Sequence, residues 1–393
     1  MKYIPYVNIK MGTASHPRRS YGNTLPLTQI PFGMVSFCPQ TEKRGGWFFH
    51  PSHEFTEGIR LTHQPSPWIN DYGTFLMTPQ NDVVSDTSDG AWSGYRIGDA
   101  IFRPDYLKIH MLRPNCTFEI TPTERCAAIR LSFGDDRPSY LSFLPIKGEY
   151  FYTLDKENCL LYGRTNGHSG DRSVNFNMYF TVAFDKDSVD FEKSYQRGEG
   201  RDAAVHIALT KKEVEARLGI SYISHELASL AIERECSEKS FDEIRESAED
   251  AWEEKLSRIE IEAYDEEQMK TFYSCLYRTF LFPHKAYEYD KNGNTLHYAP
   301  FDGSIREGVR YTDNGFWDTY RTVYPLYTLI AREEFAEILE GFMTDYPECG
   351  WLPRWTSVGE VGCMPSTLID AVIAEAAVNG IGKRSVLENA LEG

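Results

Sequence analysis

The sequence lacks several features that would place it in common classes of protein. It has no apolar run that approaches the roughly 18 residues that a membrane-spanning helix requires. Residues 1–10 (MKYIPYVNIK) show neither the basic region nor the apolar segment of a secretory signal, so we expect a cytoplasmic protein without a membrane partner. Basic residues are also few: 41 Lys and Arg against 58 Asp and Glu leave a net charge of −17, which argues against nucleic acid as a partner.

Paired cysteines are absent as well. The cysteines occur singly, without a CxxC motif and without histidines at zinc-ligand spacing. We therefore predict buried free thiols rather than a disulfide framework or a zinc site. The eight cysteines are Cys38, Cys116, Cys126, Cys159, Cys236, Cys275, Cys349 and Cys363.

The chain is long enough for two or three domains, since it has 393 residues, of which 41% are hydrophobic. From about residue 95 to 223, apolar residues alternate with polar ones, as at Leu107, Ile109 and Met111. Repeated half-buried strands separated by polar turns predict an antiparallel β-sandwich. The first 90 residues show no clean period and are rich in Gly, Pro, His and Trp, which is typical of long functional loops.

After the β region, the apolar period changes to three and four residues. Ser240 and Glu243 form a capping box for a helix over 241–259, and a second helix begins near Glu266 and is ended by Pro283. Further helical stretches are expected at 316–331, 333–345 and 367–379. The pattern predicts an α+β multidomain chain, with a β-sandwich domain over 1–236, a helical connector over 237–262 and a helical domain over 263–393.

Aromatic residues in loops are the most informative part of the composition, because a ring can stack on the apolar face of a sugar whose hydroxyls bond to nearby carboxylates. Phe, Tyr and Trp make up 14% of the chain, although a large β-rich core also uses such residues. In RLTHQPSPWINDYG (60–73), Pro65 and Pro67 would hold Trp68 stiffly beside Asn70 and Asp71. The alternative is that Trp68 plugs the end of the sandwich.

A second loop, NGFWDTYR (314–321), combines an aromatic residue with charged groups. Asn314-Gly315 is a helix-entry signal that places Trp317 and Asp318 in the first turn, where the helix dipole favours a carboxylate. A structural role would therefore also explain Asp318. Arg321 follows Asp318 by three residues and could pair with it on the same helix face.

A third loop, GWLPRW (350–355), offers Trp351 and Trp355 around Arg354. These residues could contact a sugar, but a cation–π cluster would also explain them. His63 and Asn23 could orient loops or touch a substrate, although a structural histidine is the commoner outcome.

Seven stretches, in this order, resemble glycoside hydrolase family 92, a group of mostly bacterial α-mannosidases that often act on α-1,2 linkages. Any one motif would be weak, but seven in register cover nearly the whole chain. They are YGNTLPLTQIPFGM (21–34), RLTHQPSPWINDYG (60–73), PTERCAAIRLSF (122–133), GISYIS (219–224), FYSCLYRTFLFP (272–283), NGFWDTYRTVYPLYTLI (314–330) and GWLPRW (350–355).

The resemblance implies a fold and a mechanism. It implies an N-terminal β-sandwich followed by an (α/α)6 toroid, with the active site between them, and calcium-dependent removal of terminal mannose from a mannose-containing oligosaccharide with inversion. Inversion uses a general acid and a general base whose carboxyls lie roughly 6.5–9.5 Å apart, and Ca2+ takes oxygen ligands. About five helices are expected after residue 237, whereas a six-fold double ring requires twelve, so we expect a partial toroid.

In the family, the acid, the base and most calcium ligands lie in a later portion of the helical domain, so no catalytic or metal-binding residue is assigned in this sequence. Asp370 falls where many relatives have a Gly-Thr-His stretch before an acidic residue, but here the segment reads Pro365-Ser366-Thr367. Two alternatives stay open: a non-catalytic carbohydrate-binding remnant, and a glycoside phosphorylase of similar architecture. The resemblance gives these substrate-binding candidates: Trp68, Trp317, Asp318, Arg321, Trp351, Arg354 and Asp370.

Overall fold

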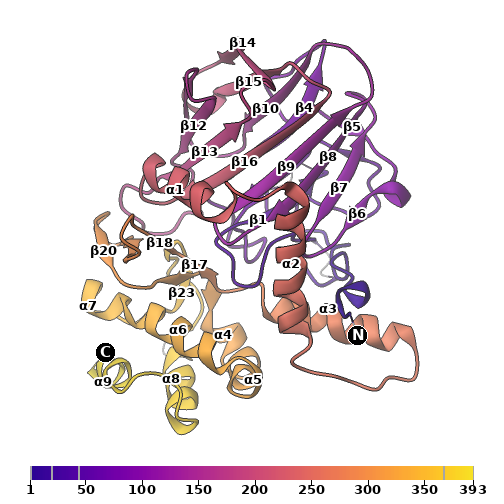
Figure 1. Cartoon of the computed structure of the whole chain (residues 1–393). Helices are drawn as coiled ribbons and strands as arrows, with labels where there is room; N and C mark the ends of the chain where they lie inside the picture. The colour runs from indigo at the N-terminus through magenta and orange to yellow at the C-terminus, as the bar shows by residue number, and fades with distance from the viewer. Residues whose placement is uncertain (1, 19–20, 43–44, 366–367, 393) are drawn as a thin grey trace.

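A computed structural model describes residues 2–18, 21–42, 45–365 and 368–392 of the chain. The β-rich part and the helical part lie at opposite ends of the molecule, and helix α2 (Phe241–Leu256) runs along one side between them (Figure 1). This arrangement confirms the predicted antiparallel sandwich followed by helices. None of the described helices is both long enough and apolar enough to span a membrane.

One face of the sandwich is a six-stranded antiparallel sheet. Three of its strands belong to the first 90 residues, where the sequence predicted loops, so that prediction is wrong for these segments. Every residue of the three strands is buried, and a strand buried on both faces shows no alternation that periodicity could reveal. In spatial order the strands are β1 (Ser36–Gln40), β3 (Gly58–Thr62), β4 (Phe75–Asn81), β10 (Ser139–Pro145), β15 (Ala204–Leu209) and β14 (Val189–Arg197).

The other face is an eight-stranded antiparallel sheet in which the predicted alternation is confirmed. Its strand Leu107–Met111 has three buried residues separated by two half-buried ones. Rings from both sheets fill the space between them, as where the Phe75 and Phe180 centroids lie 4.3 Å apart. In spatial order the strands are β11 (Tyr150–Asp155), β12 (Leu160–Thr165), β13 (Met178–Phe184), β16 (Glu213–Ser221), β9 (Cys126–Phe133), β8 (Cys116–Pro122), β7 (Leu107–Met111) and β6 (Ile101–Phe102).

Two helices connect the sandwich to the rest of the chain. Helix α1 (His225–Glu235) packs on β16, where Gly219 leaves room for it: a Cβ at Gly219 would lie 2.3 Å from the carbonyl oxygen of Ala228. Helix α2 begins with the predicted capping box, because the Ser240 hydroxyl accepts from the Glu243 amide and the Glu243 carboxylate accepts from the Ser240 amide. This box fixes the start of α2.

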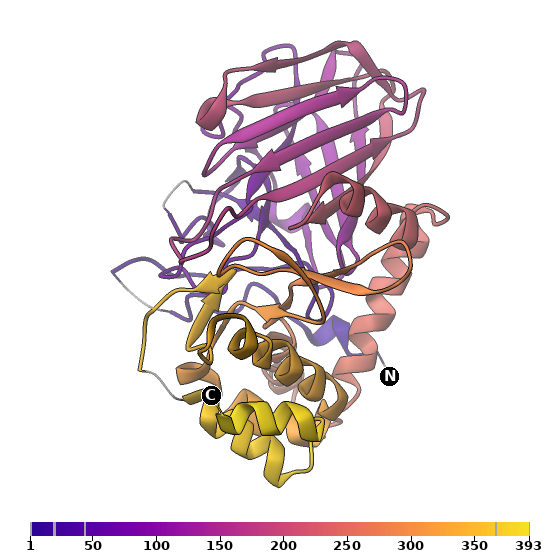
Figure 2. The ribbon, with the colours of Figure 1, turned by 90° about the vertical axis from the view of Figure 1, so that its left-hand side faces the viewer.

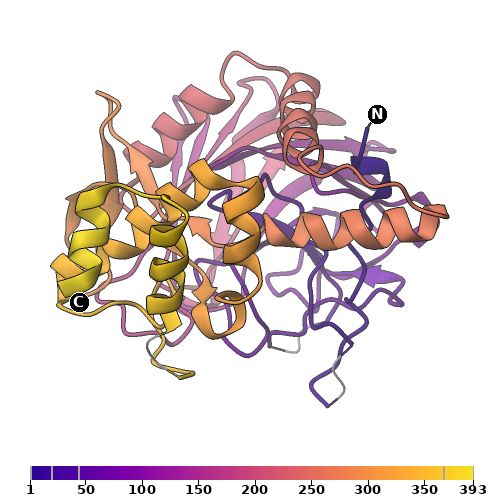
Figure 3. The same cartoon turned by 90° about the horizontal axis from the view of Figure 1, so that it is seen from below.

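The remaining helices lie below the sandwich in Figure 1 and therefore in front of it in Figure 3. One predicted helix differs from the structure. The expected helix over 316–331 is two helices, since Pro325 is tolerated in a first helical turn but would break a continuous helix. Thr367, the expected start of the last long helix, lies outside the described residues. The helices are α3 (Glu266–Thr279), α4 (Phe316–Thr319), α5 (Val323–Ile330), α6 (Arg332–Met343), α7 (Asp345–Cys349), α8 (Leu368–Val378) and α9 (Arg384–Glu392).

Short strands accompany both parts of the molecule. The sheet β18–β20 lies between the sandwich and the helices (Figure 2). At this boundary the buried Arg125 guanidinium donates two hydrogen bonds, of 3.0 and 2.9 Å, to the Tyr287 carbonyl. The short sheets are β2 (Phe55–Thr56) with β5 (Ser93–Gly94), β17 (His284–Lys285) with β21 (Tyr311–Thr312), β18 (Tyr287–Tyr289) with β19 (Thr295–Tyr298) and β20 (Ile305–Glu307), and β22 (Asn314–Gly315) with β23 (Trp355–Ser357) and β24 (Gly359–Glu360).

A second core joins the N-terminal segment to the helical part. The ring centroids of Tyr3 and Tyr273 lie 5.0 Å apart, and the Trp252 indole donates to the Gln29 carbonyl at 2.6 Å. Figure 1 accordingly shows the N-terminus beside α3. Residues far apart in sequence therefore fix the helices against the sandwich.

Candidate functional site

A small sheet brings two of the candidate loops together. Strands β22 and β23 pair so that Gly315 lies opposite Trp355. The indole occupies the space beside Gly315, because a Cβ at that position would lie 2.1 Å from Trp355 Nε1. Helix α4 starts directly after this contact and places Trp317 and Asp318 in its first turn, as the sequence predicted.

Asp318 makes contacts that differ from the predicted ones. Burial raises the pKa of its carboxyl, and a hydrogen bond from the Trp355 side chain partly opposes that rise. No described ion pair joins Asp318 to Arg321, whose guanidinium instead lies 4.8 Å from the centroid of the Tyr320 ring. The predicted pair is therefore wrong. Trp317 is 47% exposed, which leaves its ring available to a ligand.

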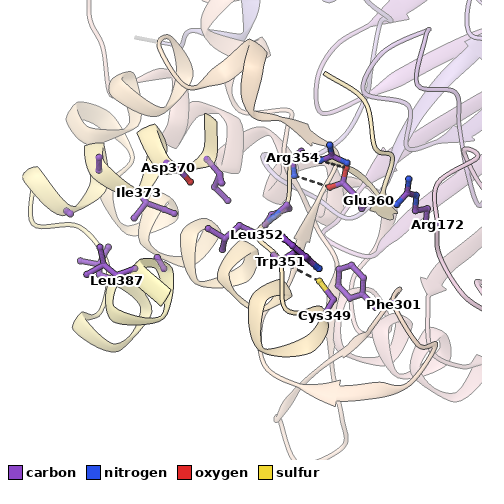
Figure 4. Close-up of a pocket in the computed structure, with 16 residues that line it drawn as sticks. Arg172, Phe301, Cys349, Trp351, Leu352, Arg354, Glu360, Asp370, Ile373 and Leu387 are labelled. Carbon is purple, nitrogen blue, oxygen red and sulfur yellow. Dashed lines mark hydrogen bonds and ion pairs between the residues drawn. The ribbon is translucent and has the colours of Figure 1, made fainter. Parts of the chain in front are cut away.

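The loop 350–355 borders a cavity of about 960 Å³ (Figure 4). Three predicted residues line it, namely Trp351, Arg354 and Asp370. Arg354 Nε lies 3.6 Å from a Glu360 carboxylate oxygen, and the Arg354 amide donates to the other oxygen at 2.9 Å. Because Trp355 is buried and no described cation–π contact involves Arg354, the predicted Trp–Arg cluster is wrong.

The cavity combines polar groups with a mainly apolar wall from α8 and α9. Trp351 is 77% exposed, so its ring can cover one face of a bound molecule. Arg354 is a hydrogen-bond donor, and the carboxylates of Glu360 and Asp370 are acceptors. An exposed indole beside donors and acceptors suits a ligand that has both apolar faces and hydroxyl groups, such as a sugar ring.

Trp68 lies on the loop between β3 and β4. Its side chain is 61% exposed, so it does not plug the sandwich, and that alternative is wrong. Trp47 packs edge-on against it, with ring centroids 5.4 Å apart and an interplanar angle of 88°. Asn23 accepts a hydrogen bond from the Trp47 indole at 3.2 Å and thereby supports this aromatic pair. His63 is buried and bonds through Nδ1 to the Tyr72 carbonyl at 2.8 Å, which is a structural role.

A buried polar cluster that the sequence analysis did not identify lies behind these loops. The Tyr72 hydroxyl and His284 Nδ1 both donate to Asp313 Oδ2, at 2.7 and 2.8 Å. Burial raises the pKa of the Asp313 carboxyl and lowers that of the His284 imidazole. The only sequence feature that could have identified this cluster is the position of its members: Tyr72 lies near the end of the candidate loop 60–73, and Asp313 directly precedes the candidate loop 314–321.

A second buried array has the residue types of a hydrolytic triad but cannot act as one. Ser142 Oγ lies 2.8 Å from His206 Nδ1, and His206 Nε2 lies 2.9 Å from Asp86 Oδ1. Ser142 has no exposed surface, and Gln80 donates to its oxygen at 3.0 Å. A nucleophile must reach a substrate carbonyl, so this array has a structural role.

Calcium is the one metal that the family resemblance implies, and the described residues do not fit it. They contain no group of three or more His, Cys, Asp or Glu side chains placed to hold a metal ion. Ca2+ requires six to eight oxygen ligands, several of which are commonly carboxylates. No step below therefore depends on a metal bound to these residues. The cysteines are free thiols, and five of the eight are buried, as predicted. The prediction of burial is wrong for Cys275, which is exposed, and for Cys349 and Cys363, which are half-buried.

An antiparallel sandwich followed by helices, with exposed tryptophans near carboxylates, has the features of a carbohydrate-binding protein. The chain belongs to glycosyl hydrolase family 92. The model of the family's N-terminal domain matches residues 6–221, and the model of its catalytic domain matches residues 227–392.

Solved structures agree with this assignment. The family GH92 inverting mannosidase BT2199 of Bacteroides thetaiotaomicron VPI-5482 is 31% identical over 96% of this chain, with a TM-score of 0.88. The family GH92 α-mannosidase BT3965 of Bacteroides thetaiotaomicron, in complex with mannoimidazole, is 22% identical over 100% of the chain, with a TM-score of 0.83, and shares the fold. The chain spans about half of these structures, 53% and 55% of their lengths. A search of curated proteins finds no match.

Proposed function

We propose that this chain forms the mannoside-binding portion of an α-mannosidase that removes terminal mannose, from α-1,2-linked mannosides, with inversion. The observation that carries the proposal is the 31% identity to an inverting mannosidase over 96% of this chain. The exposed tryptophans beside carboxylates support it, because an indole stacks on a sugar ring while carboxylates accept from its hydroxyls.

The proposal gives the candidate residues roles in binding rather than in bond cleavage. Aromatic rings cover the apolar faces of the sugar, the carboxylates accept hydrogen bonds from its hydroxyls, and the guanidinium groups donate to its oxygens. The acid, the base and the calcium ligands are assigned to the part of the longer relatives that this chain does not span. The residues in these binding roles are Trp68, Trp317, Trp351, Asp318, Asp370, Arg321 and Arg354.

Titration of the purified chain with mannoimidazole, followed by tryptophan fluorescence and calorimetry, tests the binding role. Trp68→Ala should weaken binding roughly two- to tenfold, because a stacked aromatic contact contributes about 0.5–1.5 kcal/mol. The matched control is Trp92→Ala, since Trp92 is comparably exposed, at 52% against 61% for Trp68, but lies on another part of the sandwich. Equal affinity of both variants, or no binding by the unmodified chain, would contradict the proposal.

Hydrolysis of an α-1,2-linked mannobiose tests the reaction. We expect no turnover by the 393-residue chain and turnover by a protein that also contains the remaining part of its relatives. Proton NMR of the fresh product should show β-mannose first, and EDTA should abolish the rate. First appearance of α-mannose or full activity in EDTA would refute the mechanism. A rate that requires phosphate would indicate a phosphorylase.

A further inference from the structure

Two loops that carry candidate sugar contacts come from different parts of the molecule. The first, 60–73, belongs to the sandwich and presents Trp68. The second, the Trp317 loop (314–321), begins with β22 two residues after the end of β21 and continues into α4, which presents Trp317 and Asp318. A sugar that contacts both loops is bound tightly only if the separation of the loops is fixed, because a displacement of a positioning group by about 1 Å can greatly weaken its contribution.

Asp313 lies where the second loop begins. It adopts a left-handed backbone conformation with φ of 63°, between β21, which pairs with β17, and β22, which pairs with β23. Aspartate tolerates this conformation better than most residues other than glycine. The turn at Asp313 therefore sets the direction in which the chain enters the Trp317 loop.

The carboxyl of Asp313 connects this turn to both neighbouring segments. Its Oδ2 accepts from the Tyr72 hydroxyl at 2.7 Å, and Tyr72 is the penultimate residue of the Trp68 loop. The same oxygen accepts from His284 Nδ1 at 2.8 Å, and His284 lies in β17 beside β21. The side chains of Asp313 and His284 have no exposed surface, so water does not compete for these bonds.

The Tyr72 end of the connection is itself held rigidly. The ring of Tyr72 stacks on His63 with centroids 4.6 Å apart, and its amide donates to Asp71 Oδ1 at 2.9 Å. A second connection runs in parallel, because Asn70 donates to the Ser169 carbonyl at 3.3 Å and the Ser169 hydroxyl donates to the Ser357 carbonyl at 3.0 Å. The first connection leads from the Trp68 loop to Asp313, between β21 and β22, and the second leads to Ser357 in β23.

We propose that Asp313 is a positioning residue, whose carboxyl holds the Trp68 loop and the Trp317 loop in a fixed relation through Tyr72 and His284. Asp313 does not touch the sugar. This inference rests on the proposed function only in that the two loops bind a mannoside together. The arrangement of the loops can be measured without any ligand.

Fluorine NMR of the chain labelled with 5-fluorotryptophan provides that measurement. Trp68→Phe and Trp317→Phe assign the two resonances. Tyr72→Phe and Asp313→Ala should shift or broaden both of them, while Asp313→Asn, which keeps an acceptor oxygen, should restore both. The matched control is Tyr106→Phe, because Tyr106 is also buried and its hydroxyl also donates to a carboxylate, that of Glu119. Tyr106 and Glu119 belong to neither loop.

Mannoimidazole titration separates this inference from the proposed function. Tyr72→Phe should weaken binding about fivefold, because the sugar must then also order the two loops that the lost hydrogen bond held, and Tyr106→Phe should leave binding unchanged. Unaltered Trp68 and Trp317 resonances in Tyr72→Phe would overturn the positioning role, even if Asp313→Ala fails to fold. Failure of the unmodified chain to bind mannoimidazole would refute the proposed function, and the resonances would still decide the positioning role.

Discussion

At the scale of single residues, buried ionisable groups at the boundary of the two parts make the stability of the protein depend on pH. Burial raises the pKa of Asp313 to about 8 and that of Glu288 to about 7. Both carboxyls lose their protons near pH 4 when unfolded, so from about pH 4 upward the folded state binds more protons and stability falls as pH rises. Burial lowers the pKa of His63 to about 4 and that of His284 to about 3. The folded state therefore binds fewer protons at these two histidines, and their contribution to stability rises with pH up to about pH 6.5.

Of these four groups, only the two carboxyls contribute to the pH dependence above pH 6.5, and this gives a prediction for Asp313→Asn. The asparagine cannot ionise but keeps an acceptor for Tyr72 and His284. We expect the melting temperature of the unmodified chain to fall between pH 6.5 and 8.5, and that of the variant to fall less. Differential scanning fluorimetry at the two pH values measures this. Asp187→Asn, at an exposed position, should behave like the unmodified chain, and equal slopes in all three proteins would contradict the prediction.

The sequence identified exposed candidate residues better than buried ones. Trp68 and Trp351 are exposed on loops, and Trp317 is exposed in the first turn of α4, as a ligand contact requires. Tyr72 and Asp313 could not be recognised, because each is an ordinary residue in sequence and their contact joins positions 241 residues apart. The predicted pair of Asp318 and Arg321 failed because helical spacing permits a contact but does not select it over the neighbouring Trp355 and Tyr320 rings.

At the scale of elements, the small sheet β22–β23 positions two of the candidate loops. Gly315→Ala tests this, because the added Cβ would lie 2.1 Å from Trp355 Nε1 and would force the two strands apart. We expect a loss of about 1–3 kcal/mol in the free energy of unfolding, measured by urea denaturation. Gly98→Ala is the control, since a Cβ there meets no atom within 4 Å. A Gly315→Ala variant as stable as the control would contradict the prediction, since β22 and β23 would then accommodate the added Cβ without loss of stability.

Elements were predictable where one local signal dominates. The capping box predicted the start of α2, and alternation predicted β7. Strands β1, β3 and β4 were missed because they are buried on both faces, which removes the alternation.

At the scale of the whole molecule, Arg125 joins the sandwich to the helical part. Its guanidinium is buried, donates to the Tyr287 carbonyl and pairs with Glu124 and Glu235. Arg125→Ala leaves two carboxylates without this partner, so we expect a loss of about 3–5 kcal/mol and a separation of the two parts into distinct unfolding transitions. Scanning calorimetry measures both effects.

Arg137→Ala provides the comparison for Arg125→Ala. Arg137 pairs with Asp135 and Asp82 on the surface, where its side chain is 40% exposed. Surface pairs contribute about 0–1 kcal/mol, so one transition close to that of the unmodified chain is expected. A single, equally stable transition in Arg125→Ala would show that the boundary does not couple the two parts.

The sequence by itself determined the class of fold, the family and the loops that carry the candidate residues, because alternation, helical period and short motifs are local properties of a chain. Only the tertiary structure decided which loops lie together, which candidate side chains are exposed and which buried groups connect them. Asp313 shows the reason: its partners Tyr72 and His284 come from distant segments, and the burial that makes their bonds strong exists only once those segments have packed.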